Sequence, residues 1–472
     1  MAECDGRCYG RTPRGQHSAL LKAGQLKKME SAILHRSLGK AYPTAVSGQG
    51  VYLITDNGQK ILDGSSGAAV SSLGHGNTEV IEAVVTQARN LSFAHTSFFT
   101  SDPAEELARV IIDRSNGAFS KVTFLSSGSE AVETALKIAR QHHIYNGEPE
   151  RIHIIGRMHA YHGNTLGALA AGNNPPRRDA FSPLLSSAFH HVSRCFYDAD
   201  GQGMSEGVYE DRLISEIESK IETLGPKTVA AMIVEPVGGA TLGSVPPTRT
   251  YLPRLKDLCS RYGILLIFDE VMCGMGRVGS YHAWQQLGGV APDLQTIGKG
   301  LGAGYQPLSA VLLAPKVVAA FEEGSKKSLK FTSGHTFQGH SMGCAGALAV
   351  HRILKRDQLI SHVGEMGMLL ESVLQKGLLS EINEYAVSMR GMGLFRTVDF
   401  GRMQVALGGP LAQEVADETF RRGAAVYTCS PAVDAILFAP PFIITAKEVA
   451  ELSDIFVSAL RAVTKRRKGS KL

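Results

Sequence analysis

Residues 264–271 read Ile-Leu-Leu-Ile-Phe-Asp-Glu-Val, an uninterrupted apolar run that ends in two carboxylates and a valine. Such a run is typical of a strand buried on both faces, as in a parallel sheet covered by helices. Two carboxylates at the end of a buried strand are costly unless a cation or a hydrogen-bond donor meets them. The stretch therefore predicts an α/β fold with a ligand site at the carboxyl ends of its strands.

Further apolar runs repeat this pattern along the chain and alternate with helical spacing of apolar residues between about residues 76 and 320. We expect buried strands at residues 121–125, 152–155, 229–234, 264–268, 294–297 and 308–313. Their alternation with helices predicts a large domain with a mainly parallel sheet. Near the N-terminus, Asp56-Asn57-Gly58 lies between two short apolar runs and predicts a β-hairpin.

The length of 472 residues suits two or three structural units. We expect five segments: a flexible basic extension at 1–28, an N-terminal part of a small domain at 29–75, a large domain at 76–340, the C-terminal α/β part of the small domain at 341–463, and a basic tail at 464–472. Glycine makes up about 11% of the chain, 51 residues, against a usual value of about 7%. This excess predicts tight turns and close backbone approaches, as in a cofactor-binding enzyme.

The charge of the chain is concentrated near its two ends. The formal net charge is +5, but residues 1–28 carry six basic and two acidic side chains, and residues 461–472 carry six basic and none acidic. The 37 basic and 42 acidic residues between them leave a slightly acidic body. We therefore expect no nucleic-acid partner. No apolar run approaches 18 residues, so we expect no membrane span.

Seven scattered cysteines, with no His/Cys set beside them, predict reduced thiols in an intracellular compartment and no metal site. The last residues, Ser470-Lys471-Leu472, match the tripeptide that the peroxisomal import receptor reads from a free C-terminus. The preceding residues 465–469 are polar enough to stay exposed and flexible. We expect import into the peroxisome. The alternative is a chance match and a cytoplasmic protein.

The first of four motifs at expected strand ends is Ser127-Gly128-Ser129-Glu130, which opens a helix after the strand at 121–125. Ser127 and Glu130 fit a capping box, which is an ordinary helix start. A glycine and hydroxyls at a helix N-terminus also make an anion site, because free N–H groups and the helix dipole favour phosphate. The motif alone supports both interpretations equally.

The other three motifs supply a carboxylate, an amine and an aromatic ring. Asp269 ends the strand at 264–268 and is expected to hold a protonated ring nitrogen, with a metal or a helix cap as alternatives. Lys299 stands among glycines after a buried strand, where burial favours the neutral amine of Schiff-base chemistry. An ordinary surface lysine or a phosphate-binding lysine is the alternative, although no P-loop pattern is present. Tyr161-His162 either stacks on a planar cofactor or is a packed structural pair.

A phosphate cradle, a carboxylate, an aromatic face and an amine are together the needs of pyridoxal 5′-phosphate. From about residue 35 to 460 the sequence resembles the class III pyridoxal-phosphate aminotransferases of fold type I. Seven motifs in order carry the resemblance: Gly74-His75-Gly76, residues 127–137, Tyr161-His162-Gly163, Glu235-Pro236, Asp269-Glu270-Val271, residues 299–307, and Gly334-His335-Thr336-Phe337.

The resemblance implies a role for each matching residue. Lys299 would form the Schiff base with the cofactor and shuttle the proton of the substrate carbon, and Asp269 would keep the pyridine nitrogen protonated. The remaining cofactor-binding positions would be Ser127, Gly128, Ser129, Tyr161, His162, Glu235, Val271 and Thr336. Gly128 and Ser129 would hold the phosphate, Tyr161 and Val271 the two ring faces, and Glu235 the phenolic side or the pocket entrance.

Because Thr336 would reach the phosphate of the partner subunit, the resemblance also implies a homodimer. Many members carry a carboxylate-binding arginine shortly before the segment that is Ala439-Pro440-Pro441 here. Residues 423–434 contain no arginine, and Tyr427 aligns near its place. The missing arginine and the small Ala69 predict a roomier, less carboxylate-selective pocket, and Phe98 or Phe99 is expected to add an aromatic wall from the partner. As an alternative, Arg390 or Arg396 takes the carboxylate-binding role.

These features predict an aminotransferase with ping-pong kinetics, which passes an amino group from an amine or ω-amino acid to an oxo acid such as pyruvate. An aminomutase, a racemase or a decarboxylation-dependent enzyme of the same fold is the second hypothesis. A non-catalytic homologue is the third, and the presence of Lys299, Asp269 and Ser129 argues against it.

Overall fold

The computed structural model describes residues 31–382 and 387–469. The chain divides into two units, one up to Thr44 and one from Ala45 onward. The described part of the first unit, residues 31–44, contains neither helix nor strand, and the ring of His35 stacks on Tyr42 with centroids 4.7 Å apart. The expected extension 1–28 and the tripeptide 470–472 lie outside the described residues.

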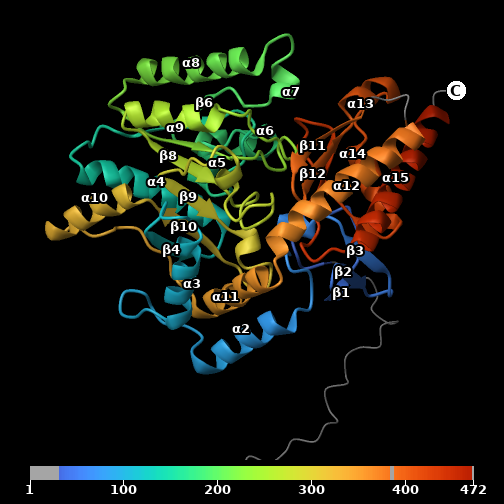
Figure 1. Cartoon of the computed structure of the whole chain (residues 1–472), viewed down its shortest axis with the longest axis horizontal. Coiled ribbons are helices and arrows are strands. Elements are labelled where there is room, and N and C mark those ends of the chain that lie inside the picture. The colour runs from blue at the N-terminus through green and yellow to red at the C-terminus, as the bar shows by residue number, and fades with distance from the viewer. Residues whose placement is uncertain (1–30, 383–386, 470–472) are drawn as a thin grey trace, which may run out of the picture. The chain divides into compact units, whose positions relative to one another are not determined.

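A seven-stranded sheet forms the centre of the second unit, in the order β4-β10-β9-β8-β7-β5-β6 (Figure 1). Its strands are β4 (Lys121–Leu125), β5 (His153–Arg157), β6 (Phe189–Val192), β7 (Val229–Val234), β8 (Leu265–Asp269), β9 (Leu294–Ile297) and β10 (Ser309–Leu313). Strand β10 is antiparallel to both its neighbours, β4 and β9, and the strands from β5 to β9 pair in parallel. The expected mainly parallel sheet is confirmed.

Helices cover both faces of this sheet, because side chains alternate along each strand. In β8, Leu266 and Phe268 pack into one apolar cluster with α3 (Asp102–Asp113), α8 (Glu206–Leu224) and α9 (Tyr251–Arg261). On the opposite face, Leu265 and Ile267 pack with α4 (Gly128–Tyr145) and α10 (Pro315–Lys326). The short helices of this part are α5 (Leu166–Ala171), α6 (Pro175–Arg178), η1 (Asp179–Leu184), α7 (Tyr197–Asp200), η2 (Ala283–Gln286) and η3 (Lys299–Leu301).

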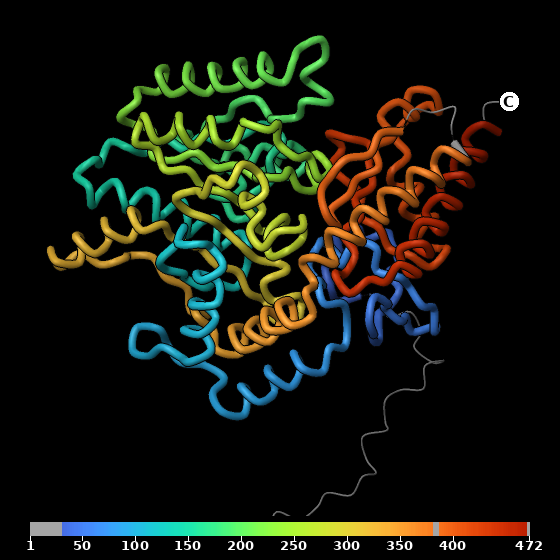
Figure 2. Tube along the Cα trace, in the orientation of Figure 1, coloured from blue at the N-terminus to red at the C-terminus, as the bar shows by residue number. Residues whose placement is uncertain are grey.

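N-terminal strands and C-terminal elements together build a smaller α/β part around a third apolar cluster (Figure 2). One four-stranded sheet contains β1 (Ala45–Gln49), β2 (Tyr52–Thr55), β3 (Lys60–Asp63) and β13 (Ala424–Ala425). The other contains β11 (Ser388–Met392), β12 (Phe395–Asp399), β15 (Ala435–Phe438) and β14 (Tyr427–Thr428). The remaining helices are α1 (Ser66–Ala69), α2 (Thr78–Asn90), α11 (Ser341–Arg356), α12 (Leu359–Ile382), α13 (Gly401–Leu407), α14 (Ala412–Arg421) and α15 (Ala446–Gly469).

The structure confirms the six expected strands within one or two residues, and it confirms the hairpin, whose turn contains Gly58 at φ +82°. It adds β6, which the sequence did not predict because His190 and His191 interrupt its apolar pattern. The expected flexibility of residues 465–469 is wrong, because α15 continues through them to Gly469. Ion pairs of Arg466 with Glu418 and of Arg467 with Glu414 fix this last turn on α14. The expected domain boundaries stay predictions.

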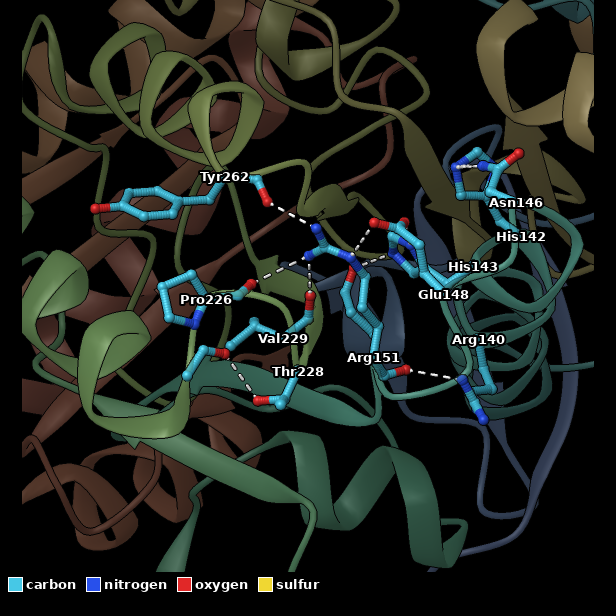
Figure 3. A network of polar contacts seen from close by, with 12 residues as sticks. Arg140, His142, His143, Asn146, Glu148, Arg151, Pro226, Thr228, Val229 and Tyr262 are labelled. Carbon is cyan, nitrogen blue, oxygen red and sulfur yellow. Dashed lines mark hydrogen bonds and ion pairs between the residues drawn. The ribbon is translucent and has the colours of Figure 1, made fainter.

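At the amino-end edge of the sheet, a polar network surrounds the buried Arg151 (Figure 3). Its guanidinium donates to the carbonyl oxygens of Val229 and Tyr262 at 2.8 and 3.1 Å and pairs with Glu148 at 3.0 Å. The two carbonyl groups belong to the first residue of β7 and to the turn before β8. The network therefore stabilises the edge opposite to the strand ends where the sequence motifs lie.

Candidate functional site

The sequence motifs gather at one edge of the seven-stranded sheet. Strands β4, β5, β7, β8 and β9 run in the same direction, since β10 is antiparallel to both β4 and β9. Their carboxyl ends therefore lie together at one edge. The residues at or after these ends are Ser127, Tyr161, Glu235, Asp269 and Lys299. This is the edge at which open α/β sheets bind ligands.

Asp269 ends β8 with its carboxylate buried and held by three donors. One carboxylate oxygen, Oδ2, lies 2.7 Å from Nδ1 of His162, and both side chains are at most 5% exposed. The other, Oδ1, accepts hydrogen bonds from the Thr296 hydroxyl at 2.9 Å and from the Val271 N–H at 3.1 Å. These contacts fix the orientation of the carboxylate, and an acceptor with two oxygens keeps capacity for a further donor.

Glu270 has a different function from its neighbour. It is fully buried, and its two oxygens accept the N–H groups of Ala283 and Trp284 at 2.7 and 3.0 Å, at the start of η2. Burial raises the pKa of this carboxyl to about 8. The helix cap, considered above as an alternative role for Asp269, is instead the role of its neighbour Glu270.

Lys299 begins η3 directly after β9, with a left-handed φ of +41°. A non-glycine residue in this region stores strain, which is found mainly at functional sites. Burial lowers the pKa of its amine below the usual range, against the opposing effect of the Asp269 and Glu235 carboxylates. A lysine amine with a lowered pKa is neutral, and therefore nucleophilic, over a wider pH range.

The capping box predicted at the start of α4 is present. The Ser127 hydroxyl accepts the Glu130 N–H at 3.2 Å, and the Glu130 carboxylate accepts the Ser127 N–H at 3.1 Å. Position 128 has no room for a side chain, because a Cβ on Gly128 would lie 2.7 Å from Cγ1 of Val271. The Ser129 hydroxyl accepts the Asn164 N–H at 2.9 Å. The helix start and the loop after β5 therefore form one cradle.

Tyr161 and Glu235 lie beside this cradle. Glu235 is 8% exposed, and its carboxylate accepts the N–H of Gly239 at 2.9 Å and that of Tyr161 at 3.4 Å. Burial raises the pKa of Glu235, although nearby His162 lowers it in part. The carboxylate thus fixes the backbone of the aromatic residue that precedes His162.

The structure brings some of the expected substrate-pocket residues together and leaves others apart. Ala69 and Tyr427 belong to one apolar cluster with Cys273. Phe98 and Phe99 are 80% and 65% exposed in this single chain, and Thr336 is exposed as well. Among the described residues, no ring contact or hydrogen bond joins these three side chains to Ala69, Tyr427 or Lys299.

Sequence reasoning missed the part of Thr296 and Asn164 in the site. Thr296 is a polar residue inside an apolar strand, a signal that pointed to a buried partner. Asn164 contributes its backbone N–H, which carries no signal in the side-chain pattern. Within residues 31–382 and 387–469, no cluster of three or more His, Cys, Asp or Glu side chains is placed to hold a metal ion. In the same ranges, no helix has the length and apolarity that crossing a membrane requires.

Comparison with known proteins identifies the family. The model of the class III aminotransferase family matches residues 36–460. The chain belongs to the class III aminotransferases. An uncharacterized aminotransferase of Schizosaccharomyces pombe is 38% identical over 426 residues, which cover 87% of this chain and 90% of the relative. Putrescine–pyruvate aminotransferase of Pseudomonas aeruginosa is 30% identical over 415 residues, 86% of this chain and 87% of the relative.

Solved structures agree with this membership. The ω-transaminase of Pseudomonas jessenii, solved in complex with PMP, superposes with a TM-score of 0.84 at 32% identity. The match covers 90% of this chain and 93% of that chain. Class III aminotransferases depend on pyridoxal 5′-phosphate, so the family supplies the reaction class and the cofactor class for the site described above.

Proposed function

We propose that this protein binds pyridoxal 5′-phosphate and transfers an amino group from an amine or ω-amino acid to an oxo acid such as pyruvate. The proposal depends on one observation above all. A partly buried lysine and a buried aspartate with three hydrogen-bond partners lie at the ends of adjacent strands. Asp269, which ends β8, pairs with Thr296 of β9, and Lys299 follows three residues later.

The residues at this edge fit the cofactor. Gly128 and Gly163 keep the start of α4 open, where helix N–H groups and the Ser129 hydroxyl favour a phosphate. The Asp269 carboxylate stabilises a protonated ring nitrogen. Tyr161 offers a ring face, and the Val271 side chain packs against the cradle glycine.

When bound, the cofactor supplies an aldehyde that takes up the amino nitrogen and a ring that withdraws electrons from the substrate carbon. Lys299 would hold that aldehyde, and its neutral amine would remove and return the proton at the substrate carbon. Asp269 would keep a proton on the ring nitrogen, and His162 and Thr296 fix the carboxylate in place. Because the oxidised donor would leave before the acceptor enters the same site, we expect ping-pong kinetics.

Purified holoenzyme tested with a panel of amines and ω-amino acids, against pyruvate and 2-oxoglutarate, checks this proposal. We expect oxidised donor in equimolar amount with alanine or glutamate. Lys299→Ala is expected to abolish turnover, and the exposed Lys327→Ala to leave it unchanged. Product formed without any acceptor would indicate an aminomutase, a racemase or a decarboxylation instead.

We also propose a homodimer in which an exposed aromatic group is covered by a second copy. Phe93 and Phe337 lie with ring centroids 5.8 Å apart, and Phe98 and Phe99 with centroids 6.4 Å apart. All four rings are at least 40% exposed, and exposed apolar groups of this kind mark interfaces. Thr336 precedes Phe337, so the same contact would carry it towards the partner's site. Phe98→Asp is expected to shift the sedimentation coefficient to that of a monomer, and an unchanged dimer would contradict the interface.

For localisation we propose peroxisomal import through Ser470-Lys471-Leu472. A fluorescent protein fused in front of the whole chain should colocalise with a peroxisomal marker and become cytoplasmic when these three residues are removed. Diffuse fluorescence of the full-length fusion would contradict import.

A further inference from the structure

The two arginines considered above as substitutes for the missing carboxylate-binding arginine are bound elsewhere. Arg390 pairs with Asp399 at 2.7 Å and donates to the carbonyl oxygens of Gly243 and Leu242 at 2.7 and 2.6 Å. Arg396 pairs with Glu371 at 2.8 Å and donates to the Gly391 carbonyl at 2.9 Å. Arg390 joins β11 and β12 to the loop after β7, and Arg396 binds within the smaller α/β part. Both guanidinium groups are already bound, so neither is available to a substrate.

Arg177, in the short helix α6, is different. Its guanidinium carbon lies 5.4 Å from the centre of the Tyr161 ring. The side chain is partly buried, and among the residues that the structure describes it has neither a hydrogen bond nor an ion pair. A guanidinium group that lies over an aromatic ring contacts the ring through its own flat face. The N–H donors along the edges of the guanidinium therefore stay available to an acceptor in the guanidinium plane.

The backbone just before Arg177 is anchored to two loops. The Asn173 N–H donates to the Ala160 carbonyl at 2.9 Å, next to Tyr161. The Asn174 side chain, 6% exposed, accepts the Ser430 hydroxyl at 3.2 Å, and Ser430 belongs to the loop that follows β14 with Tyr427. The Arg177 N–H donates to the Asn174 carbonyl at 3.0 Å. The arginine is therefore held where the Tyr161 loop meets the loop after β14.

The residue on whose ring Arg177 lies is connected to the groups of the site. Tyr161 is bonded through its N–H to Glu235, whose charge acts on the Lys299 amine, and it precedes His162, the partner of Asp269. A permanently charged group kept half-buried without an anion is stabilised once an anion arrives. Oxo acids and amino acids bring a carboxylate that matches the guanidinium fork.

We infer that Arg177 is the specificity-determining residue that binds a carboxylate of the substrate at the Tyr161 loop. This inference rests on the proposed function, since it assigns the carboxylate of the acceptor or donor in that reaction. It predicts that the enzyme prefers substrates with a carboxylate although the C-terminal arginine is absent.

Arg177→Met in the holoenzyme tests the assignment with one fixed amine donor and three acceptors: pyruvate, 2-oxoglutarate and butanal, which has no carboxylate. Loss of a charge-assisted hydrogen-bonded pair should lower kcat/KM for one or both oxo acids about 10- to 100-fold, mainly through KM. With butanal kcat/KM should stay within about twofold of wild type. Arg177→Lys should restore part of the loss, because it keeps the charge without the planar fork.

Arg212 provides the matched control, since its guanidinium carbon lies 5.0 Å from the Tyr209 ring on α8. Arg212→Met should leave kcat/KM unchanged for all three acceptors. A second readout is independent of turnover: calorimetric titration with glutarate should detect binding to wild type and to Arg212→Met, and weak or no binding to Arg177→Met.

Equal losses for butanal and the oxo acids would show a merely structural role and overturn the inference. Unchanged oxo-acid kinetics together with unchanged glutarate binding in Arg177→Met would overturn it as well. If wild type transferred no amino group to any acceptor, the proposed function would fail, and glutarate binding would then decide the carboxylate site alone.

Discussion

Gly163→Ala offers a quantitative check on the cradle between α4 and the loop after β5. Gly163 has φ +134°, and a Cβ there would lie 2.7 Å from the Ser129 hydroxyl oxygen and 2.9 Å from Cβ of Ala168. Backbone strain of this kind costs about 1–3 kcal/mol, and overpacking adds about 1–3 kcal/mol. The sum is about 2–6 kcal/mol of lost stability, unless the cradle opens to relieve part of it.

Gly147→Ala separates the two contributions, because Gly147 has φ +77° and nothing within 4 Å of its missing Cβ. Both variants share the entropic effect of replacing glycine on the unfolded chain. Urea unfolding should therefore show Gly163→Ala less stable than Gly147→Ala by about 1–3 kcal/mol. An absorbance titration with pyridoxal 5′-phosphate should show weaker cofactor binding by Gly163→Ala than by Gly147→Ala. The dissociation constant should rise about tenfold for each 1.4 kcal/mol of binding free energy lost through displacement of Ser129. Equal stability and equal cofactor affinity of the two variants would refute the account of the cradle.

Three further predictions concern charged groups. Asp269→Asn keeps a side chain of the same shape but removes the charge, so kcat should fall at least about 10²-fold in a steady-state assay; a loss below tenfold would contradict the role of its charge. Burial lowers the pKa of Lys299 in the folded protein below its value of 10.5 in the unfolded chain. Between these two pKa values the lysine is protonated in the unfolded chain and neutral in the folded one, so it destabilises the folded state below pH 10.5. Lys299→Met should therefore raise the thermal midpoint of the apoenzyme at pH 7, with the gain shrinking towards pH 10.5; a pH-independent difference would contradict this. The hydrogen bond from Arg466 lowers the pKa of Glu418 below 4.5, so Glu418→Gln should lower the free energy of unfolding above pH 4.5. In urea unfolding the difference from wild type should vanish as the pH falls through the lowered pKa, and a difference that persists in acid would argue against the ion pair.

The parts of the fold that depend on local pattern could be predicted from the sequence. Strand β8 is buried on both faces, so it consists of a continuous apolar run that can be recognised without knowing its neighbouring strands. The capping box of Ser127 and Glu130 is complete within four residues. Strand β6 could not be predicted in the same way, because its two histidines are accommodated by tertiary contacts such as the 3.0 Å contact between His190 and His153.

The candidate site was predictable as a set of residues but not as a geometry. The His162–Asp269 contact joins positions 107 residues apart, and nothing local in either motif specifies it. The C-terminal basic segment was misjudged for a similar reason: its charges look solvated in the sequence, whereas Glu414 and Glu418 on α14 bind them. The absence of an arginine near Tyr427 was visible in the sequence, but the position of Arg177 on the Tyr161 ring was not.

The central claim is that Lys299 is the residue that holds the cofactor's aldehyde. Holoenzyme treated with borohydride, which reduces a Schiff base to a stable amine, can be digested and mapped by mass spectrometry. We predict one phosphopyridoxyl group per chain, on the peptide that contains Lys299, and none after prior exchange with an excess of an active amine donor. Modification of a different lysine, or none in a protein that transaminates, would contradict the account.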